Sequence, residues 1–132
     1  MGLALYEDKI LTYKVKDKVS DSSFYRLIGG HIEFGEYAED ALKREFYEEI
    51  SQEIRVVKQL GVFENIFFYN GKDCHEFLSL FKIEFVDKDV YAMNEIVGIE
   101  NSAPAFTANW VETQEFKQDK KILYPTQAID YI

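Results

Sequence analysis

Hydrophobic residues between Ala38 and Ile50 recur at the spacing of a helix. Leu42, Phe46 and Ile50 stand four residues apart, and polar side chains occupy the positions between them. Because an α-helix turns once in about 3.6 residues, residues four apart share one face. The segment therefore predicts an amphipathic helix that buries one side against the rest of the protein.

Elsewhere the apolar residues gather in runs rich in β-branched and aromatic side chains, which are typical of strands. These runs cover residues 3–6, 10–15, 24–28, 54–69, 76–85 and 106–111. Turn-forming residues at 7–9 predict a first hairpin, and Asn-Gly at 70–71 predicts a second.

The remaining segments show weaker patterns. Residues 31–34 read as a brief extended piece, and residues 87–103 read as a polar loop. The stretch 115–132 is expected to be helical in part, with a break at Pro125. Strands on both sides of one helix indicate a mixed α/β fold.

The length of 132 residues, with 47% hydrophobic content, fits a single domain over residues 1–132. No apolar run approaches the roughly 18 to 20 residues that span a bilayer, and no signal peptide is evident. We therefore expect a cytoplasmic protein without a membrane partner. Cys74 is the only cysteine, so neither an intrachain disulfide nor structural zinc is expected.

The net charge of −9, from 15 basic and 24 acidic side chains, disfavours a nucleic-acid polymer as partner. A small phosphorylated ligand remains compatible with this charge, because a bound metal ion supplies positive charge locally. A homodimer is left open by the sequence.

Three carboxylates crowd one face of the expected helix. Glu45, Glu48 and Glu49 fall within an arc of about 100°, and each like-charged pair costs a few tenths of a kcal/mol even in water. Their proximity favours a bound cation. Carboxylate oxygens suit a hard divalent ion, Mg²⁺ or Mn²⁺, which commonly also binds substrate phosphates.

The residues around this helix resemble the signature of the Nudix (MutT-like) hydrolase family. The positions in register are Gly30, Glu36, Arg44, Glu45, Phe46, Glu48 and Glu49. The resemblance implies an α/β/α sandwich around a mixed sheet. It also implies hydrolysis, with Mg²⁺ or Mn²⁺, of a nucleoside diphosphate linked to another group: a (d)NTP, a dinucleoside polyphosphate or a nucleotide sugar.

The same resemblance implies roles for individual residues. The metal ligands would be the Gly29 carbonyl, Glu45, Glu48 and Glu49. The catalytic set would be Glu45, Arg44 and Glu48, with Glu45 as ligand or base and Arg44 holding a glutamate in place. Glu36 would support the loop and the start of the helix.

Four positions depart from the family pattern: Ile28 in place of proline, Tyr37 in place of a capping Ser or Thr, Ser51 in place of glycine, and Gln52 in place of an aliphatic residue. All concern the scaffold, and the carboxylates are intact. These changes motivate an alternative, a Nudix scaffold that binds or senses a nucleotide without turnover. A third alternative is an acidic interaction domain without a ligand.

Outside the signature, Tyr69 and Glu76 are the candidates for substrate contact. The spacing of Tyr69 from Gln52 resembles that of dinucleoside polyphosphate hydrolases in the family. His31 is interpreted as structural rather than catalytic. The distal base is left open among four glutamates: Glu64, Glu76, Glu95 and Glu100.

Overall fold

The computed structural model describes residues 1–132, and its eight strands form one mixed sheet. The strands are β1 (Gly2–Tyr6), β2 (Lys9–Lys16), β3 (Ser23–Arg26), β4 (Ile54–Tyr69), β5 (Lys72–Phe85), β6 (Ile96–Glu100), β7 (Ala103–Glu112) and β8 (Leu123–Tyr124). The helices are α1 (Ala38–Ile50) and α2 (Thr113–Lys117), and η1 (Lys88–Ala92) and η2 (Thr126–Tyr131) are 3₁₀ turns. None of the helices combines the length and apolar character required to cross a lipid bilayer.

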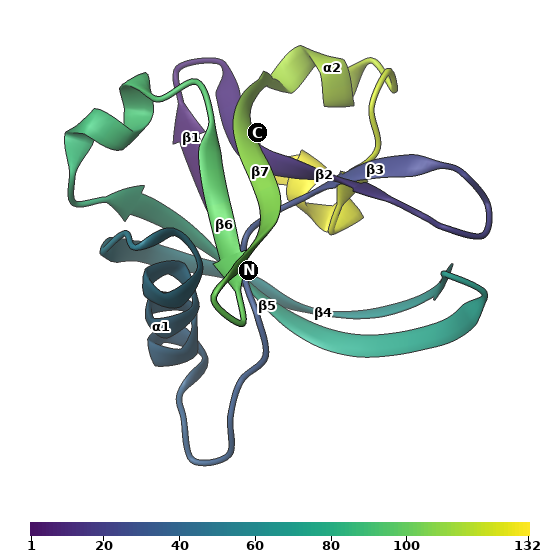
Figure 1. The fold of residues 1–132 in the computed structure, drawn as a ribbon, viewed down its shortest axis with the longest axis horizontal. Coiled ribbons are helices and arrows are strands. Elements are labelled where there is room, and N and C mark those ends of the chain that lie inside the picture. The colour runs from purple at the N-terminus through teal and green to yellow at the C-terminus, as the bar shows by residue number, and fades with distance from the viewer.

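The strand order along the main path of the sheet is β4-β5-β1-β2-β3-β8, and β7 pairs with both β2 and β6. The expected first hairpin is confirmed, since Leu5 pairs with Ile10 in antiparallel register. Parallel pairing of β1 with β5, and of β3 with β8, makes the sheet mixed. Figure 1 shows this arrangement, with α1 beside the sheet.

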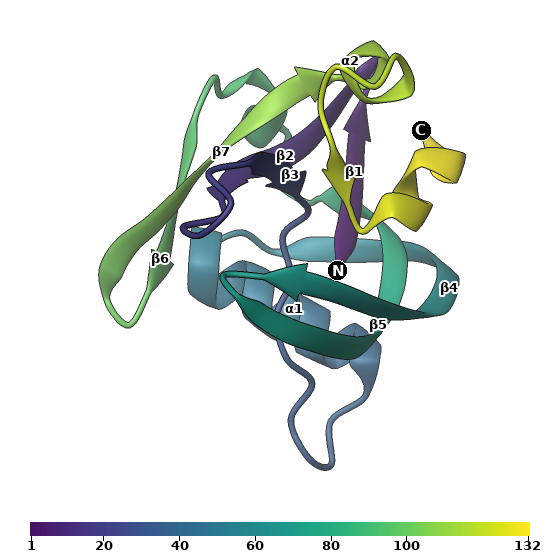
Figure 2. The ribbon, with the colours of Figure 1, turned by 90° about the vertical axis from the view of Figure 1, so that its right-hand side faces the viewer.

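Hydrophobic cores lie on both faces of the sheet. Successive residues on a strand point to opposite faces, so the neighbours Leu3 and Ala4 belong to different cores. One core contains Leu42, Phe46 and Ile50 of α1. The other is covered by the C-terminal elements, which lie on the far side of the sheet from α1 (Figure 2). The expected α/β/α sandwich is thereby confirmed.

Helix α1 has the predicted bounds and buries the predicted face. No side chain caps its N-terminus at Tyr37, and Glu39 and Asp40 in the first turn provide favourable interactions with the helix dipole instead. Ser51 ends the helix in the left-handed conformation, at φ 55°. A residue with a Cβ pays about 1 kcal/mol for this conformation, which glycine adopts freely.

The β4–β5 hairpin is confirmed, although β5 begins at Lys72, four residues earlier than expected. Two other expectations were wrong. Residues 87–103 contain η1 and β6 rather than a loop, because Ile96 and its neighbours pair with β7. Residues 31–34 form no strand, because side-chain bonds from α1 hold this loop away from the sheet.

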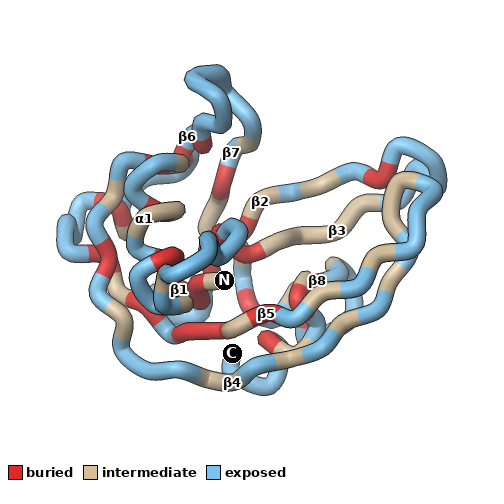
Figure 3. Tube along the Cα trace, turned by 90° about the horizontal axis from the view of Figure 1, so that it is seen from below, coloured by how far each residue is buried: buried red, intermediate tan, exposed pale blue.

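The tips of the β2–β3 and β4–β5 hairpins lie side by side, at one end of the molecule (Figure 3). Asp17 accepts a hydrogen bond from the Asn70 amide at 3.1 Å, and the Asn70 side chain accepts one from the Lys18 amide at 2.8 Å. Asp17 also accepts bonds from two amides of its own turn, and these bonds lower its pKa. We call this reciprocal contact of Asp17 and Asn70 the hairpin clasp.

Candidate active site

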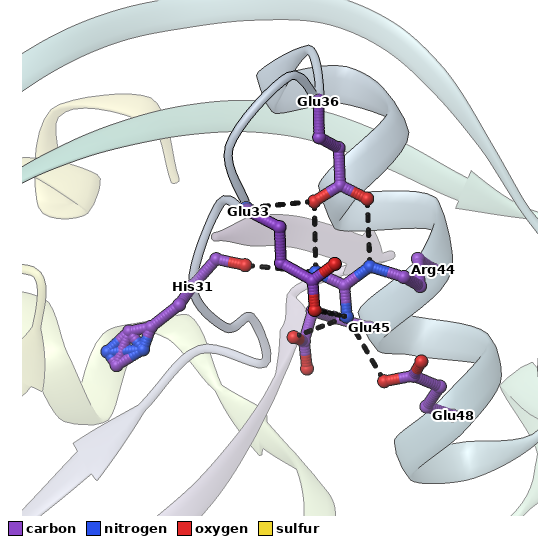
Figure 4. Close-up of polar contacts among 6 residues, drawn as sticks. All are labelled: His31, Glu33, Glu36, Arg44, Glu45 and Glu48. Carbon is purple, nitrogen blue, oxygen red and sulfur yellow. Dashed lines mark hydrogen bonds and ion pairs between the residues drawn. The ribbon is translucent and has the colours of Figure 1, made fainter.

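Arg44 is the centre of a polar network that joins α1 to the preceding loop (Figure 4). Its guanidinium donates two bonds to the Glu36 carboxylate, at 2.8 and 3.0 Å, and one bond to the His31 carbonyl at 3.0 Å. It also donates to Glu45 at 2.9 Å and to Glu48 at 3.1 Å. A single side chain therefore fixes the loop and two of the signature glutamates at once.

Glu36 completes the attachment of the loop. Its Oε1 accepts a bond from the Glu33 amide at 3.1 Å, in addition to the paired bonds from Arg44. The bonds from Arg44 lower the pKa of Glu36, which therefore stays ionised over a wide pH range. Paired bonds between arginine and carboxylate fix orientation as well as distance, so the loop has one defined path into α1.

Glu45 lies directly against the backbone of Gly30. A Cβ atom placed on Gly30 would lie only 2.2 Å from Cδ of Glu45 and 2.4 Å from its Oε2. The Glu45 side chain is 16% exposed. Glycine at position 30 thus leaves the room that the carboxylate of Glu45 occupies.

The folded protein disfavours the ionised form of Glu49. Burial raises the pKa of Glu49 to about 7, the charge of Glu45 adds to this effect, and Arg26 only partly opposes it. Glu48, by contrast, is 58% exposed and lies against Arg44 one helical turn away. Glu45 and Glu49 form the more enclosed part of the carboxylate cluster.

This cluster matches a hard divalent cation in its ligand chemistry, although the carboxylates do not form a closed cage. No group of three or more acidic, histidine or cysteine side chains converges on one point. Glu49 is half-buried close to Glu45, and a bound oxygen-liganded cation would stabilise its ionised form. Gly29 is buried against Met1, and its backbone adjoins this region.

Two cavities with volumes of about 400 and 560 Å³ adjoin each other at the loop that precedes α1. Both are lined by Arg26, His31 and Glu76. The smaller extends along α1 and β5. The larger, which we call the aromatic cavity, lies between β3, the β4–β5 hairpin and β8, and its aromatic lining residues are Phe24, Phe67, Phe68, Tyr69 and Tyr124.

The two residues predicted to contact substrate, Tyr69 and Glu76, both line the aromatic cavity. Three other lining residues were not predicted from the sequence: Phe24, Arg26 and Tyr124. Arg26 carried a usable signal, because it is a lone charge in the otherwise apolar segment 24–28. Its Nε atom is buried and has no hydrogen-bond partner.

The structure separates the four candidates for the distal base. Glu64 pairs with His75 at 2.7 Å on the exposed side of the hairpin, and Glu76 accepts a bond from the Tyr124 hydroxyl. Glu95 is exposed. Glu100, at the end of β6, lies close enough to Glu49 to raise its pKa.

The mixed sheet between helices, and the carboxylates gathered on one helix behind a glycine loop, agree with the Nudix signature noted in the sequence. The family model for the NUDIX domain matches residues 2–127, nearly the whole chain. The chain belongs to the Nudix family and is a hydrolase that acts on pyrophosphate bonds. The family generally uses divalent metal ions and acts on small nucleotide substrates.

Solved structures agree on the fold. The ORF135 protein of E. coli superposes with a TM-score of 0.62 at 21% identity, covering 98% of this chain and 80% of that chain. A NUDIX hydrolase from Nitrosomonas europaea superposes with a TM-score of 0.58 at 17% identity, covering 98% and 82%. No curated protein sequence matches the chain.

Proposed function

We propose that this protein, as one domain over residues 1–132, hydrolyses a nucleoside diphosphate linked to another group, with Mg²⁺ or Mn²⁺. The substrate would be a (d)NTP, a dinucleoside polyphosphate or a nucleotide sugar. The observation that supports this most directly is the half-buried Glu49, because burial and the nearby Glu45 disfavour its ionised form and a bound cation would stabilise it. The smaller of the two cavities is lined by Gly30 and by residues of α1 other than the glutamates, and the two cavities together offer room for a nucleotide.

The carboxylates of Glu45, Glu48 and Glu49, together with the Gly29 carbonyl, would hold the ion. When bound, such an ion polarises the phosphates and lowers the pKa of a water molecule. Glu48 is exposed and pairs only with Arg44, so its carboxylate is free to turn toward the ion. Glu45 is held by Arg44 and needs no rearrangement to keep its place beside Gly30.

Arg44 acts as a positioning residue in this proposal. It orients Glu45 and Glu48, and it anchors the loop that contains Gly29 and Gly30 through Glu36 and the His31 carbonyl. We take Glu100 as the distal carboxylate, since it contributes from a different element to the raised pKa of Glu49. His31 contributes its backbone, and its imidazole is turned away from Arg44 (Figure 4).

The proposal is tested by product release from a panel of nucleotides with Mg²⁺ or Mn²⁺. Glu48→Gln should lower kcat/KM by about 100-fold or more, because even partners that only support a ligand are worth 10- to 100-fold. Glu39→Gln, on an exposed part of the same helix, is the matched control and should leave activity unchanged. No turnover with any nucleotide and either metal would refute the proposal.

The alternative, a scaffold that binds a nucleotide without cleaving it, has one structural observation in its favour. Ser51 ends α1 in a conformation that suits glycine, and Tyr37 provides no cap, so both ends of the acidic helix are weakened. Calorimetry would distinguish the two functions. Tight binding of a nucleotide that stays intact for hours would support the scaffold, and measurable turnover would exclude it.

A further inference from the structure

The aromatic cavity is walled by aromatic rings that pack against one another. The ring of Tyr124 packs against Phe67 at 5.2 Å and against Phe24 at 6.1 Å, and Phe24 packs against Tyr69 at 5.6 Å between ring centroids. These four rings come from three separate elements, β3, β4 and β8. Aromatic side chains bind nucleobases by stacking, and stacking alone distinguishes poorly between bases.

Glu76 is an acidic group beside these rings. Its Oε1 accepts a hydrogen bond from the Tyr124 hydroxyl, and no protein group donates a hydrogen bond to its Oε2. Burial raises the pKa of Tyr124, and the bond to Glu76 raises it further, so the hydroxyl stays protonated and remains a donor. One oxygen of Glu76 is therefore committed to Tyr124, and the other can accept a bond from a ligand.

Arg26 sets the direction in which a nucleotide would lie. Its charge acts on Glu49 of the acidic helix on one side and on Tyr124 of the aromatic cavity on the other. Arg26 forms no ion pair with Glu76, and its Nε lacks a partner. The phosphates of a nucleotide would therefore be attracted to Arg26 and repelled by Glu76. The nucleobase, rather than a phosphate, would then lie next to Glu76.

We propose that Glu76 selects nucleotides whose base carries an exocyclic amino group, by accepting a hydrogen bond from that group inside the aromatic cavity. This inference rests on the proposed function of the site and names its substrate class. Cytosine, adenine and guanine each present an amino donor on their pairing edge. Uracil and thymine present carbonyl oxygens at the corresponding positions, and these oxygens repel a carboxylate.

The first experiment compares nucleotides that differ only in the group concerned. The wild-type protein should show kcat/KM at least about 10-fold higher for CTP than for UTP, since one well-formed base contact discriminates by roughly that amount or more. GTP should likewise exceed ITP, which lacks the 2-amino group. Equal rates within each pair would overturn the inference.

The Glu76→Gln variant tests the residue itself. Its carbonyl oxygen can still accept the Tyr124 hydroxyl, so the cavity should keep its shape, and an unchanged Tm would verify this. The CTP to UTP ratio should fall to within about 3-fold of unity, because the amide offers the carbonyls of uracil a donor. Glu84→Gln is the matched control, since Glu84 lies on the same strand, pairs with Arg55, lines neither cavity and should leave the ratio unchanged.

Binding measured without metal separates this inference from the proposed function. Calorimetry with CMP and UMP needs no turnover. The wild type should bind CMP more tightly than UMP, and Glu76→Gln should bind the two nucleotides with similar affinity. If that holds while no nucleotide is hydrolysed, the inference stands and the hydrolase proposal fails. If Glu76→Gln instead alters the ratio of CTP to dCTP and leaves that of CTP to UTP intact, Glu76 contacts the sugar and the inference is wrong.

Discussion

Replacing Gly30 by alanine should damage activity while leaving the fold almost intact. The new Cβ would lie 2.2 Å from Cδ of Glu45, whereas ordinary contacts of this kind begin at 3.4 Å. The obstructing atoms belong to the far end of a flexible side chain, so the carboxylate can retreat at little cost to stability. It must move by roughly 1 Å, and a misplacement of that size can cost about 100-fold in rate.

The assay has three readouts. We expect kcat/KM of Gly30→Ala to fall by about 100-fold, with Tm lowered by only a few degrees, in line with the small effects of changes that create no core defect. Affinity for Mn²⁺, measured by calorimetry, should weaken in parallel because Glu45 has been displaced. The positive-φ glycines elsewhere are unsuitable as controls, because alanine would strain the backbone there. Gly30 has no positive φ, so alanine at position 30 acts through the Glu45 contact and not through backbone strain.

A double variant shows whether the effect passes through Glu45. If alanine at position 30 acts only by displacing that carboxylate, it should add nothing once Glu45 is itself alanine. Gly30→Ala with Glu45→Ala should then be no less active than Glu45→Ala alone. Wild-type activity in Gly30→Ala, or a further 100-fold loss in the double variant, would refute the reasoning.

Two further predictions concern the same site. Arg44→Lys should lower kcat/KM by about 10- to 100-fold, because an ammonium cannot reproduce the paired bonds to Glu36. Lys43→Arg, on the exposed face of the helix, is the control and should leave kcat/KM unchanged. Near-wild-type activity of Arg44→Lys would contradict the positioning role. Glu49 has a pKa of about 7 in the folded protein, against 4.5 as its ordinary value. Its contribution to the free energy of unfolding is therefore fully present below about pH 4.5 and is lost as the pH rises through about 7. Chemical denaturation of the metal-free protein should therefore show a decline over this range that Glu49→Gln removes, and an identical profile in the variant would disprove the assignment.

The sequence was sufficient for the parts of the fold that depend on local pattern. The bounds of α1 follow from residues four apart, and the β4–β5 hairpin follows from Asn70-Gly71 between two apolar runs. The segment 96–100 was missed because its neighbours are polar and its pairing with β7 spans a bulge next to Gly98. The extended reading of residues 31–34 failed because Arg44, distant in sequence, determines the path of that loop.

The site divides along the same lines. The clustering of Glu45, Glu48 and Glu49 is a property of one helix and could be read from spacing. The aromatic cavity could not, because it depends on the pairing of β3 with β8, which joins Arg26 to Tyr124 across nearly a hundred residues. Spacing alone also does not distinguish Glu45 and Glu49, which are enclosed, from Glu48, which is exposed.

The hairpin clasp has a consequence for the size of ligand that the protein accepts. A hairpin as long as β4–β5 would swing at its free end if it were attached only at its base. The contact of Asp17 with Asn70 instead ties that end to the β2–β3 turn, so the two walls of the aromatic cavity cannot spread apart independently. The clasp thereby limits how far the aromatic cavity can widen to take a larger ligand.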